Sequence, residues 1–371
     1  MKTKVTYVIS LINKAVSFEW TAELMDKQKV ELSFILLSHQ NSELEKYLVT
    51  NGFDVKHINY KNKFDLPKAL ISSILFLLKK RPDAVHAHLF EGSLVGLSAA
   101  WLCAIKKRIY TRHHSSYHHD YFPKFVKYDK LCNYLSTTII APTKIVQEIL
   151  EKKEFVPSNK IKLIHHGFKL ESFNNTTEQE IVSLKNKYST NNQYPVVGVV
   201  SRYVDWKGIQ YIIPAFKKIL LQYPNAKLVL ANARGEYGVY IKELLNEIPE
   251  KNYTEINFEN NLFALYKLFD VFVHVPITKN SEAFGQTYVE ALASKIPSVF
   301  TLSGIANDFI KNEHNALIVD YKNSEAIYKA ICEIITNKPL AEKLGINGKN
   351  DVEKLFPITK MISDLETVYL L

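Results

Sequence analysis

The alternation of apolar and polar positions predicts strands and helices in turn along most of the chain. Short apolar runs, typical of strands buried on both faces, are separated by longer segments in which apolar residues recur at helical spacing. This order is typical of parallel, doubly wound sheets, which hold their ligands at the carboxyl ends of the strands. The predicted strands are residues 5–10, 31–37, 54–58, 84–88, 107–111, 138–141 and 161–164, then 196–200, 227–231, 254–258, 271–277, 298–302 and 316–319.

The strand pattern is interrupted once, between residues 169 and 194, where Asn, Thr, Gln and Lys dominate. A chain of 371 residues is also long for one core and suits two domains of ordinary size. We therefore expect an α/β protein with two Rossmann-like domains, residues 1–168 and 169–355. The last segment, 356–371, contains a predicted helix that follows the second set of strands.

Composition indicates a globular protein outside the secretory pathway. The residues are 47% hydrophobic and 23% charged, and the longest apolar run, 69–78, is too short to span a bilayer. The N-terminus has no signal-peptide core, and the three widely spaced cysteines match no zinc or disulfide pattern. We expect a cytoplasmic location.

Charge is distributed unevenly between the two predicted domains. Residues 1–168 contain 25 Lys and Arg against 15 Asp and Glu, and ten of the twelve histidines. The basic half is expected to face something anionic: nucleic acid, a lipid surface or a phosphorylated acceptor. It contains no recognised nucleic-acid module, so we expect no nucleic-acid partner.

Two segments of the basic half could lie on an anionic membrane surface. Residues 66–80 form a predicted apolar helix followed by Arg81, and here we expect an ordinary core helix. Residues 117–130 interleave aromatic residues with lysines, which fits either a membrane-surface segment or a solvated loop. The sequence leaves that second choice open.

Residues 281–297 read as a loop followed by a helix, between two predicted strands. Gly285 ends the loop, so the backbone N–H groups of Gly285, Gln286 and Thr287 lack partners within the helix. Such a helix start at the carboxyl end of a buried strand is a natural anion site.

Two carboxylates bracket this helix start. Glu282 lies in the loop and Glu290 lies about one turn inside the helix, on the face that can look back toward the loop. An anionic ligand that also carries hydroxyl groups would suit this pair. The ordinary alternative is that Glu282 is a helix N-terminal charge and Glu290 a solvated surface residue.

A second loop contributes positive charge. Arg202 and Lys207 follow the predicted strand 196–200, and Gly208 lets the backbone turn into the next helix. A guanidinium and an ammonium that converge on one pocket suit a diphosphate, whose charge they offset as it develops on a leaving group.

With these motifs in this order, the chain resembles the retaining glycosyltransferases of family 4. The resemblance covers residues 160–320 well and the first domain weakly. It implies the GT-B fold, in which two Rossmann-like domains face a central cleft and the last helix crosses back to the first domain. The motifs that carry it are Val197-Gly198-Val199-Val200-Ser201-Arg202 with Lys207-Gly208, Glu282-Ala283-Phe284-Gly285 with Glu290, and Ile164-His165-His166-Gly167.

The resemblance implies a hexosyltransferase that uses a nucleotide-diphosphate sugar, with UDP favoured by family frequency, without a metal or other cofactor. The acceptor would be a hydroxyl of a glycan or a lipid-linked molecule in polysaccharide or glycoconjugate biosynthesis, with possible peripheral attachment to the inner membrane face. The sugar, base, acceptor and linkage are not determined by the sequence. The implied donor-site residues are Arg202, Lys207, Glu282, Phe284, Gly285, Gln286, Thr287 and Glu290, of which Arg202, Lys207 and Glu282 act at the reacting centre.

His113 is the candidate catalytic residue of the first domain, because it follows strand 107–111 where similar enzymes place a histidine against the reacting centre. Its neighbourhood is rich in histidine, which keeps a metal-dependent hydrolase open as an alternative. A non-catalytic anion-binding protein is the other alternative. The chain departs from the family in residues 11–20, where the usual glycine-rich loop is absent.

Overall fold

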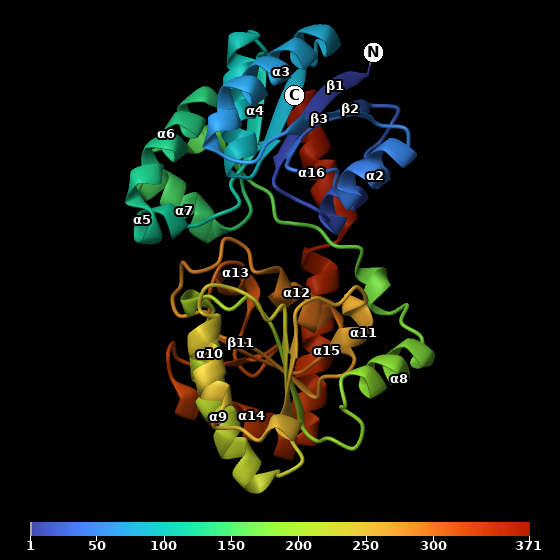
Figure 1. The fold of residues 1–371 in the computed structure, drawn as a ribbon, viewed down its shortest axis with the longest axis vertical. Coiled ribbons are helices and arrows are strands. Elements are labelled where there is room, and N and C mark those ends of the chain that lie inside the picture. The colour runs from blue at the N-terminus through green and yellow to red at the C-terminus, as the bar shows by residue number, and fades with distance from the viewer. Residues whose placement is uncertain (1) are drawn as a thin grey trace. The chain divides into compact units, whose positions relative to one another are not determined.

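The computed structural model describes residues 2–371, which form two compact units. Unit 1 consists of the residues up to Phe168 together with Phe356–Leu371, and unit 2 consists of Lys169–Leu355. Each unit is an α/β body with its own parallel sheet, as Figure 1 shows. The predicted fold class is confirmed.

Unit 1 is built on seven parallel strands in the order β3-β2-β1-β4-β5-β6-β7. The winding reverses between β1 and β4, which pair directly with Ile9 opposite His88. In doubly wound sheets the carboxyl ends of the strands at such a reversal are the usual place for a ligand. The strands are β1 (Thr3–Ser10), β2 (Val30–Ser38), β3 (Asp54–Asn59), β4 (Ala84–His88), β5 (Lys107–Thr111), β6 (Thr138–Ala141) and β7 (Ile161–Leu163).

Helices cover both faces of this sheet. The face that presents Tyr7 and Ile9 packs against α1, α2 and α16, whereas Val8 on the other face contacts Gly96 of α4. Helix α3 lies alongside α4 (Figure 1). The helices are α1 (Val16–Leu24), α2 (Glu43–Thr50), α3 (Leu66–Lys80), α4 (Phe90–Leu102), α5 (Tyr117–Tyr121), α6 (Val126–Leu135), α7 (Lys144–Lys152) and α16 (Ile358–Leu370).

The C-terminal helix α16 is part of unit 1, as the fold prediction expected. It buries Ile358, Leu365 and Tyr369 in the core of that unit. The Tyr369 hydroxyl lies 2.6 Å from His86 Nδ1 and 2.5 Å from the Tyr7 hydroxyl. Both apolar burial and a buried polar contact therefore hold α16 on the sheet.

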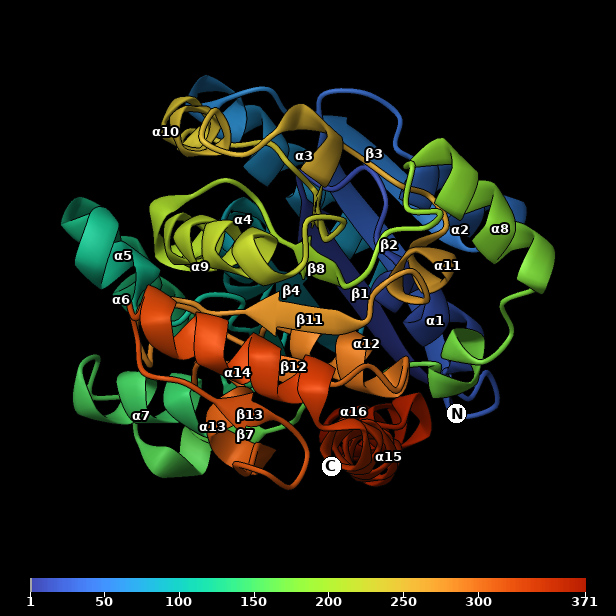
Figure 2. The ribbon, with the colours of Figure 1, turned by 90° about the horizontal axis from the view of Figure 1, so that it is seen from below.

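Unit 2 has six parallel strands in the order β10-β9-β8-β11-β12-β13. Here the reversal lies between β8 and β11, which run side by side in Figure 2. The strands are β8 (Val196–Val200), β9 (Lys227–Ala231), β10 (Tyr253–Ile256), β11 (Val271–His274), β12 (Ser298–Phe300) and β13 (Leu317–Ile318). The helices are α8 (Glu178–Lys187), α9 (Ile209–Gln222), α10 (Gly238–Leu245), α11 (Leu262–Tyr266), α12 (Gln286–Ala293), α13 (Ala306–Phe309), α14 (Ser324–Thr336) and α15 (Lys338–Leu355).

Glycines set the start of the two helices that matter most in unit 2. Gly208 precedes α9 with φ 78° and Gly285 precedes α12 with φ 85°, a backbone conformation that glycine adopts without strain. Space is a second constraint at Gly208, because a Cβ there would lie 1.9 Å from the Val275 carbonyl oxygen.

Several predicted segments differ from the structure. The strand expected over 271–277 ends at His274, and the strand expected over 298–302 ends at Phe300. The strand expected over 254–258 ends at Ile256, and Phe258 is exposed. A solvated loop over 117–130 is wrong, because α5 and part of α6 occupy this segment.

None of the helices in the described part of the chain combines the length and the apolar character that a membrane span needs.

Candidate active site

A buried charge cluster lies where the winding of the unit 2 sheet reverses. Lys207 comes from the segment after β8, Glu282 comes from the loop after β11, and His274 is the last residue of β11. Lys207 Nζ donates to Glu282 Oε1 at 2.5 Å, and His274 Nε2 lies 3.1 Å from the same oxygen. The sequence pattern thus brings Lys207 and Glu282 together at the place where this fold binds ligands.

The cluster keeps Glu282 ionised although its side chain is buried. Burial alone raises the pKa of the carboxyl, but the Lys207 charge and the His274 hydrogen bond outweigh it and hold the pKa at about 2. Burial lowers the pKa of His274, with Lys207 adding to this effect. At neutral pH the cluster is therefore an ammonium, a carboxylate and a neutral imidazole. Glu282 is not the exposed helix charge of the ordinary alternative.

The start of α12 has the geometry that an anion site requires, and the site itself stays a prediction. The helix begins at Gln286, directly after Gly285, so the first N–H groups have no partner within the helix. The Thr287 hydroxyl oxygen is buried and makes no hydrogen bond within residues 2–371. An unsatisfied hydroxyl beside free N–H groups offers additional hydrogen bonds to an incoming anion.

Glu290 lies one turn further along α12, and its carboxylate is hydrogen-bonded to a residue of the neighbouring helix α11. The Tyr266 hydroxyl of α11 donates to Glu290 Oε2 at 2.8 Å. Burial raises the pKa of Glu290 to about 7, only partly offset by this hydrogen bond. Glu290 is therefore not a solvated surface residue, and its charge changes near neutral pH.

Two other predicted donor residues occupy contrasting places. Arg202 is exposed in the segment after β8, so its guanidinium is available to a ligand. Phe284 is buried, and its carbonyl oxygen accepts a hydrogen bond from the Ile305 N–H at 2.8 Å. Phe284 thus fixes the loop before α12 rather than presenting a polar group.

In unit 1, His113 belongs to a group of histidines at the carboxyl ends of three strands. His113 Nε2 lies 3.1 Å from Nδ1 of His88, the last residue of β4. The ring of His166, from the segment after β7, stacks on His113 with centroids 5.7 Å apart. Burial and the neighbouring histidines hold the pKa of His113 well below its usual range, so its imidazole is neutral at pH 7.

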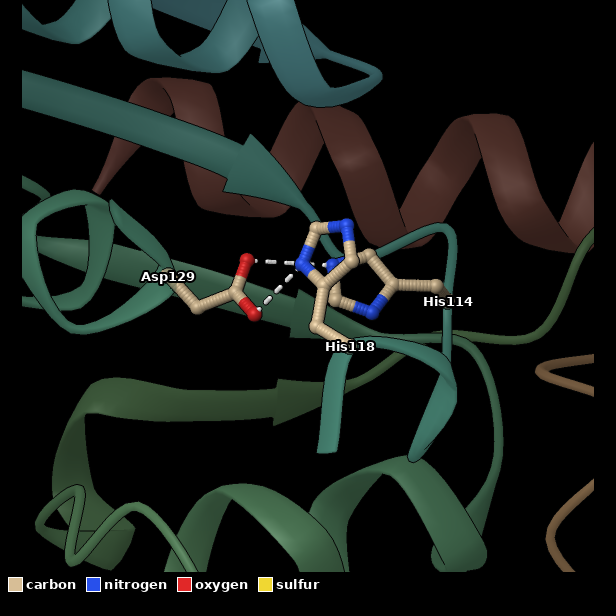
Figure 3. Close-up of side chains that lie close together, drawn as sticks. All are labelled: His114, His118 and Asp129. Atoms are coloured by element: carbon tan, nitrogen blue, oxygen red, sulfur yellow. Dashed lines mark hydrogen bonds and ion pairs between the residues drawn. The ribbon is translucent and has the colours of Figure 1, made fainter. Parts of the chain in front are cut away.

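A second cluster, next to His113 in sequence, joins His114, His118 and Asp129 (Figure 3). His114 Nε2 lies 3.1 Å and His118 Nδ1 2.8 Å from the two oxygens of Asp129. The three side chains could offer metal ligands, all within 4.8 Å of one another. However, Arg112 Nη2 lies 3.3 Å from Asp129 Oδ2, and this fixed positive charge disfavours a cation there.

The ring nitrogens give a further argument against a metal at this cluster. A histidine that binds a metal usually donates its other N–H to a partner. His114 Nδ1 is buried without a hydrogen-bond partner in the described residues. The geometry therefore fits a hydrogen-bonded ion cluster around Asp129 better than a metal centre.

Two family models together match most of the chain. The family model described as "Glycosyl transferases group 1" matches residues 181–351, and the model "Glycosyltransferase Family 4" matches residues 18–172. The first covers most of unit 2 and the second most of unit 1. This chain belongs to glycosyltransferase family 4. It is a glycosyltransferase enzyme with the GT-B fold.

Relatives of this glycosyltransferase align over most of its length. The Staphylococcus aureus "Capsular polysaccharide biosynthesis glycosyltransferase CapM" is 25% identical over 386 aligned positions, covering 100% of this chain and 97% of the relative. The "Alpha-monoglucosyldiacylglycerol synthase" of Acholeplasma laidlawii is 25% identical over 79% of this chain and 76% of the relative.

Solved structures share the fold at lower identity. The crystal structure of Anabaena HepE in complex with UDP and glucose superposes with a TM-score of 0.83, 18% identity and full coverage of both chains. Sucrose-phosphate synthase from Thermosynechococcus elongatus gives a TM-score of 0.78 at 16% identity, over 100% of this chain and 98% of the other.

Three partners of the site residues were not foreseen from the sequence of this glycosyltransferase. They are His274, Tyr266 and His88, which contact Glu282, Glu290 and His113 respectively. His274 gave one usable signal, because it is a polar residue in an otherwise apolar predicted strand. For Tyr266 and His88 the sequence contains no signal that identifies the partner, because these contacts join separate elements.

Proposed function

We propose that this glycosyltransferase is retaining and metal-independent, and that it moves a hexosyl group from a UDP-sugar to a hydroxyl of a glycan or lipid-linked acceptor. The likeness to HepE, solved with UDP, and to CapM, named for capsular polysaccharide biosynthesis, supports this donor and acceptor class. The observation that carries the proposal is the Lys207, Glu282 and His274 cluster at the reversal of the unit 2 sheet.

Lys207 and Glu282 are proposed to exchange their partners when the donor binds. In the free protein the Lys207 ammonium and the Glu282 carboxylate satisfy each other. A diphosphate beside Lys207 would compete for the ammonium and leave Glu282 to accept a hydroxyl of the transferred sugar. His274 keeps the carboxylate in place throughout, because its hydrogen bond does not depend on the donor.

The rest of the donor is assigned to groups with matching chemistry. The free N–H groups of Gln286 and Thr287 and the exposed Arg202 suit the phosphates. The Glu290 carboxylate suits the two ribose hydroxyls, which it can accept as a pair of hydrogen bonds. Together with Lys207, these groups offset the charge of the leaving diphosphate, which is the role a metal ion performs in other transferases.

In the proposed reaction, the acceptor oxygen attacks the anomeric carbon on the face from which the diphosphate leaves. The carbon–oxygen bond to the diphosphate breaks, and the hydroxyl proton passes to the leaving phosphate oxygen. The configuration is thereby retained. His113 is proposed to polarise the acceptor hydroxyl, since its neutral imidazole is held in a fixed orientation by His88 and His166.

Unit 1 is also proposed to contact an anionic membrane surface on the cytoplasmic side. Its excess of Lys and Arg over Asp and Glu supports this, because anionic lipid attracts basic segments. A lipid-linked acceptor would then be reached at the membrane.

The stereochemistry can be tested directly. The purified enzyme would be incubated in EDTA with UDP-glucose, UDP-galactose or UDP-N-acetylglucosamine, all α-linked donors, and a mixture of oligosaccharide and polyprenyl-phosphate-linked acceptors. Proton NMR of the product should show the small anomeric coupling of a new α linkage. A β linkage, or transfer that EDTA abolishes and Mg²⁺ or Mn²⁺ restores, would contradict the proposal.

A further inference from the structure

Helix α3 of unit 1 exposes an apolar face to solvent. Ile71, Leu75 and Leu78 follow at spacings of four and three, which places them on one side of the helix. Their exposed fractions are 59%, 63% and 55%, and Phe64, just before the helix, is 82% exposed. The opposite side of α3 is buried in the unit, so the expectation of an ordinary core helix is wrong for this outer face.

The end of the neighbouring helix α4 adds further exposed apolar residues. Helix α4 packs alongside α3, and Cys103, just after α4, has its sulfur 3.9 Å from the Ile74 carbonyl oxygen. The last two residues of α4, Trp101 and Leu102, are both more than half exposed. Clusters of large apolar side chains on a protein surface usually mark a contact with another body. We refer to this set as the α3 surface: Phe64, Ile71, Leu75, Leu78, Trp101 and Leu102.

The charges on α3 itself are all positive, although Asp65 directly precedes the helix. Helix α3 contains no acidic residue, whereas Lys68 and Lys79 are exposed on it and Arg81 follows it. Lys80 is paired with Asp54. An apolar helix face with cationic residues at both ends fits an anionic lipid surface, where side chains enter the acyl boundary and lysines meet the headgroups.

We propose that the α3 surface docks this enzyme onto an anionic bilayer, with α3 lying in the plane of the interface. A helix of 15 residues is about 22 Å long, enough for in-plane contact. Trp101 is suited to the same depth, because tryptophan favours the membrane–water boundary. This inference rests on the proposed membrane contact of unit 1 and gives it a place, and it is independent of the donor chemistry.

A second copy of the chain is a less suitable occupant. Pairing two α3 surfaces about a two-fold axis would bring Lys68 and Lys79 of both copies to one interface. Helix α3 itself carries no carboxylate, and only Asp65, directly before it, interacts with Lys68 among the described residues. A lipid headgroup layer supplies negative charge along the whole face.

The test compares variants of the full chain in vesicle flotation. The probe is phosphatidylcholine vesicles with and without phosphatidylglycerol, at low and high salt. The apolar variant is Ile71→Ser with Leu75→Ser and Leu78→Ser, and the charge variant is Lys68→Glu with Lys79→Glu. These positions are exposed, so folding and UDP binding should be unchanged. Matched controls are Leu221→Ser with Val239→Ser, which are exposed apolar residues of unit 2, and Lys124→Ala with Lys127→Ala and Lys130→Ala.

Wild-type protein and the unit 2 control should float with anionic vesicles at low salt. Both α3 variants should lose at least about tenfold in partitioning. The apolar variant loses the area that its side chains bury in the bilayer, and the charge variant loses the attraction of its lysines to anionic lipid. If only the Lys124, Lys127 and Lys130 variant loses binding, the membrane contact stands and its assignment to α3 is overturned.

Two other outcomes overturn the inference differently. If wild-type protein floats with no vesicle, the proposed membrane contact of unit 1 fails together with the α3 assignment, while the donor site remains unaffected. If sedimentation shows a wild-type dimer that the apolar variant converts to a monomer, the α3 surface is an interface between copies.

Discussion

Two carboxylates of unit 2 differ in their electrostatic state. Glu282 faces Lys207 and His274, and its pKa stays at about 2 despite burial. Within residues 2–371 the Glu290 carboxylate accepts its side-chain hydrogen bond from the Tyr266 hydroxyl, and burial raises the pKa of Glu290 to about 7. Because the charge of Glu282 is permanent and that of Glu290 changes near neutral pH, we predict that pH acts on the donor site through Glu290.

The Glu290 assignment predicts a pH-dependent affinity for UDP. Ribose hydroxyls donate to the ionised carboxylate, so binding requires a proton to leave whenever the pH is below the raised pKa. With a pKa of about 7, the dissociation constant should rise about tenfold between pH 8 and pH 6. Isothermal titration calorimetry over this range checks the slope.

Glu290→Gln is the control for this slope. The phosphates of UDP also titrate near pH 6, but they do so for both proteins. The variant should bind UDP more weakly at pH 8 and show only the phosphate contribution below it. Parallel pH curves for the two proteins would remove Glu290 from the ribose site.

His113 is predicted to act on turnover and not on nucleotide affinity, since it lies in unit 1 and the donor groups lie in unit 2. His113→Ala and His113→Gln should both lower kcat by about two orders of magnitude or more, the usual effect of losing a positioned acid–base or polarising group. The UDP dissociation constant should stay within twofold of the wild-type value. His39→Ala, an exposed histidine of the same unit, should keep full turnover. Equal losses of turnover and of UDP affinity would show that His113 is structural.

At the scale of elements, the sequence predicts where strands begin better than where they end. Strands β4, β5 and β8 have the predicted bounds, and the unbroken run of Val and Gly in β8 is typical of a buried parallel strand. Strand β11 ends at His274, three residues earlier than predicted, because Pro276 has no N–H to donate to the sheet. The exposed apolar face of α3 could not be predicted, since an apolar helix face looks the same in sequence whether a neighbour covers it or not.

The junction of β8 and α9 gives a prediction of its own. Gly208→Ala would combine positive-φ strain, about 1–2 kcal/mol, with a clash of the new Cβ against the Val275 carbonyl oxygen. Gly52→Ala is the matched control, because Gly52 has nearly the same φ and no atom near its Cβ position. Urea unfolding should show that Gly208→Ala lowers the free energy of unfolding more than Gly52→Ala does. The Gly208→Ala protein should also bind UDP less tightly, because Gly208 positions the neighbouring Lys207. Equal destabilisation would mean that the close approach to Val275 is unimportant.

At the scale of the whole molecule, the two units differ in charge as well as in fold detail. The first 168 residues are strongly basic, whereas the remaining 203 contain 22 Lys and Arg against 23 Asp and Glu. The candidate site residues other than His113 all lie in unit 2. Motif order was enough to select these candidates, because each follows a strand whose carboxyl end the fold fixes, and their role in donor binding stays a prediction. Their partners His274 and Tyr266 depend on packing between separate elements and became visible only in the structure.

The most direct test of the central claim is thermal unfolding of the full chain with UDP, GDP or ADP in EDTA. A ligand that binds only the folded protein stabilises it by about 2.7 kcal/mol at a hundred times its dissociation constant. UDP should raise the melting temperature of the wild type, and Lys207→Ala and Glu290→Ala should each remove most of that rise. Lys217→Ala and Glu247→Ala break an exposed ion pair of the same unit and should keep it in full. A wild-type protein that no nucleotide stabilises, or site variants that retain the whole shift, would contradict the account.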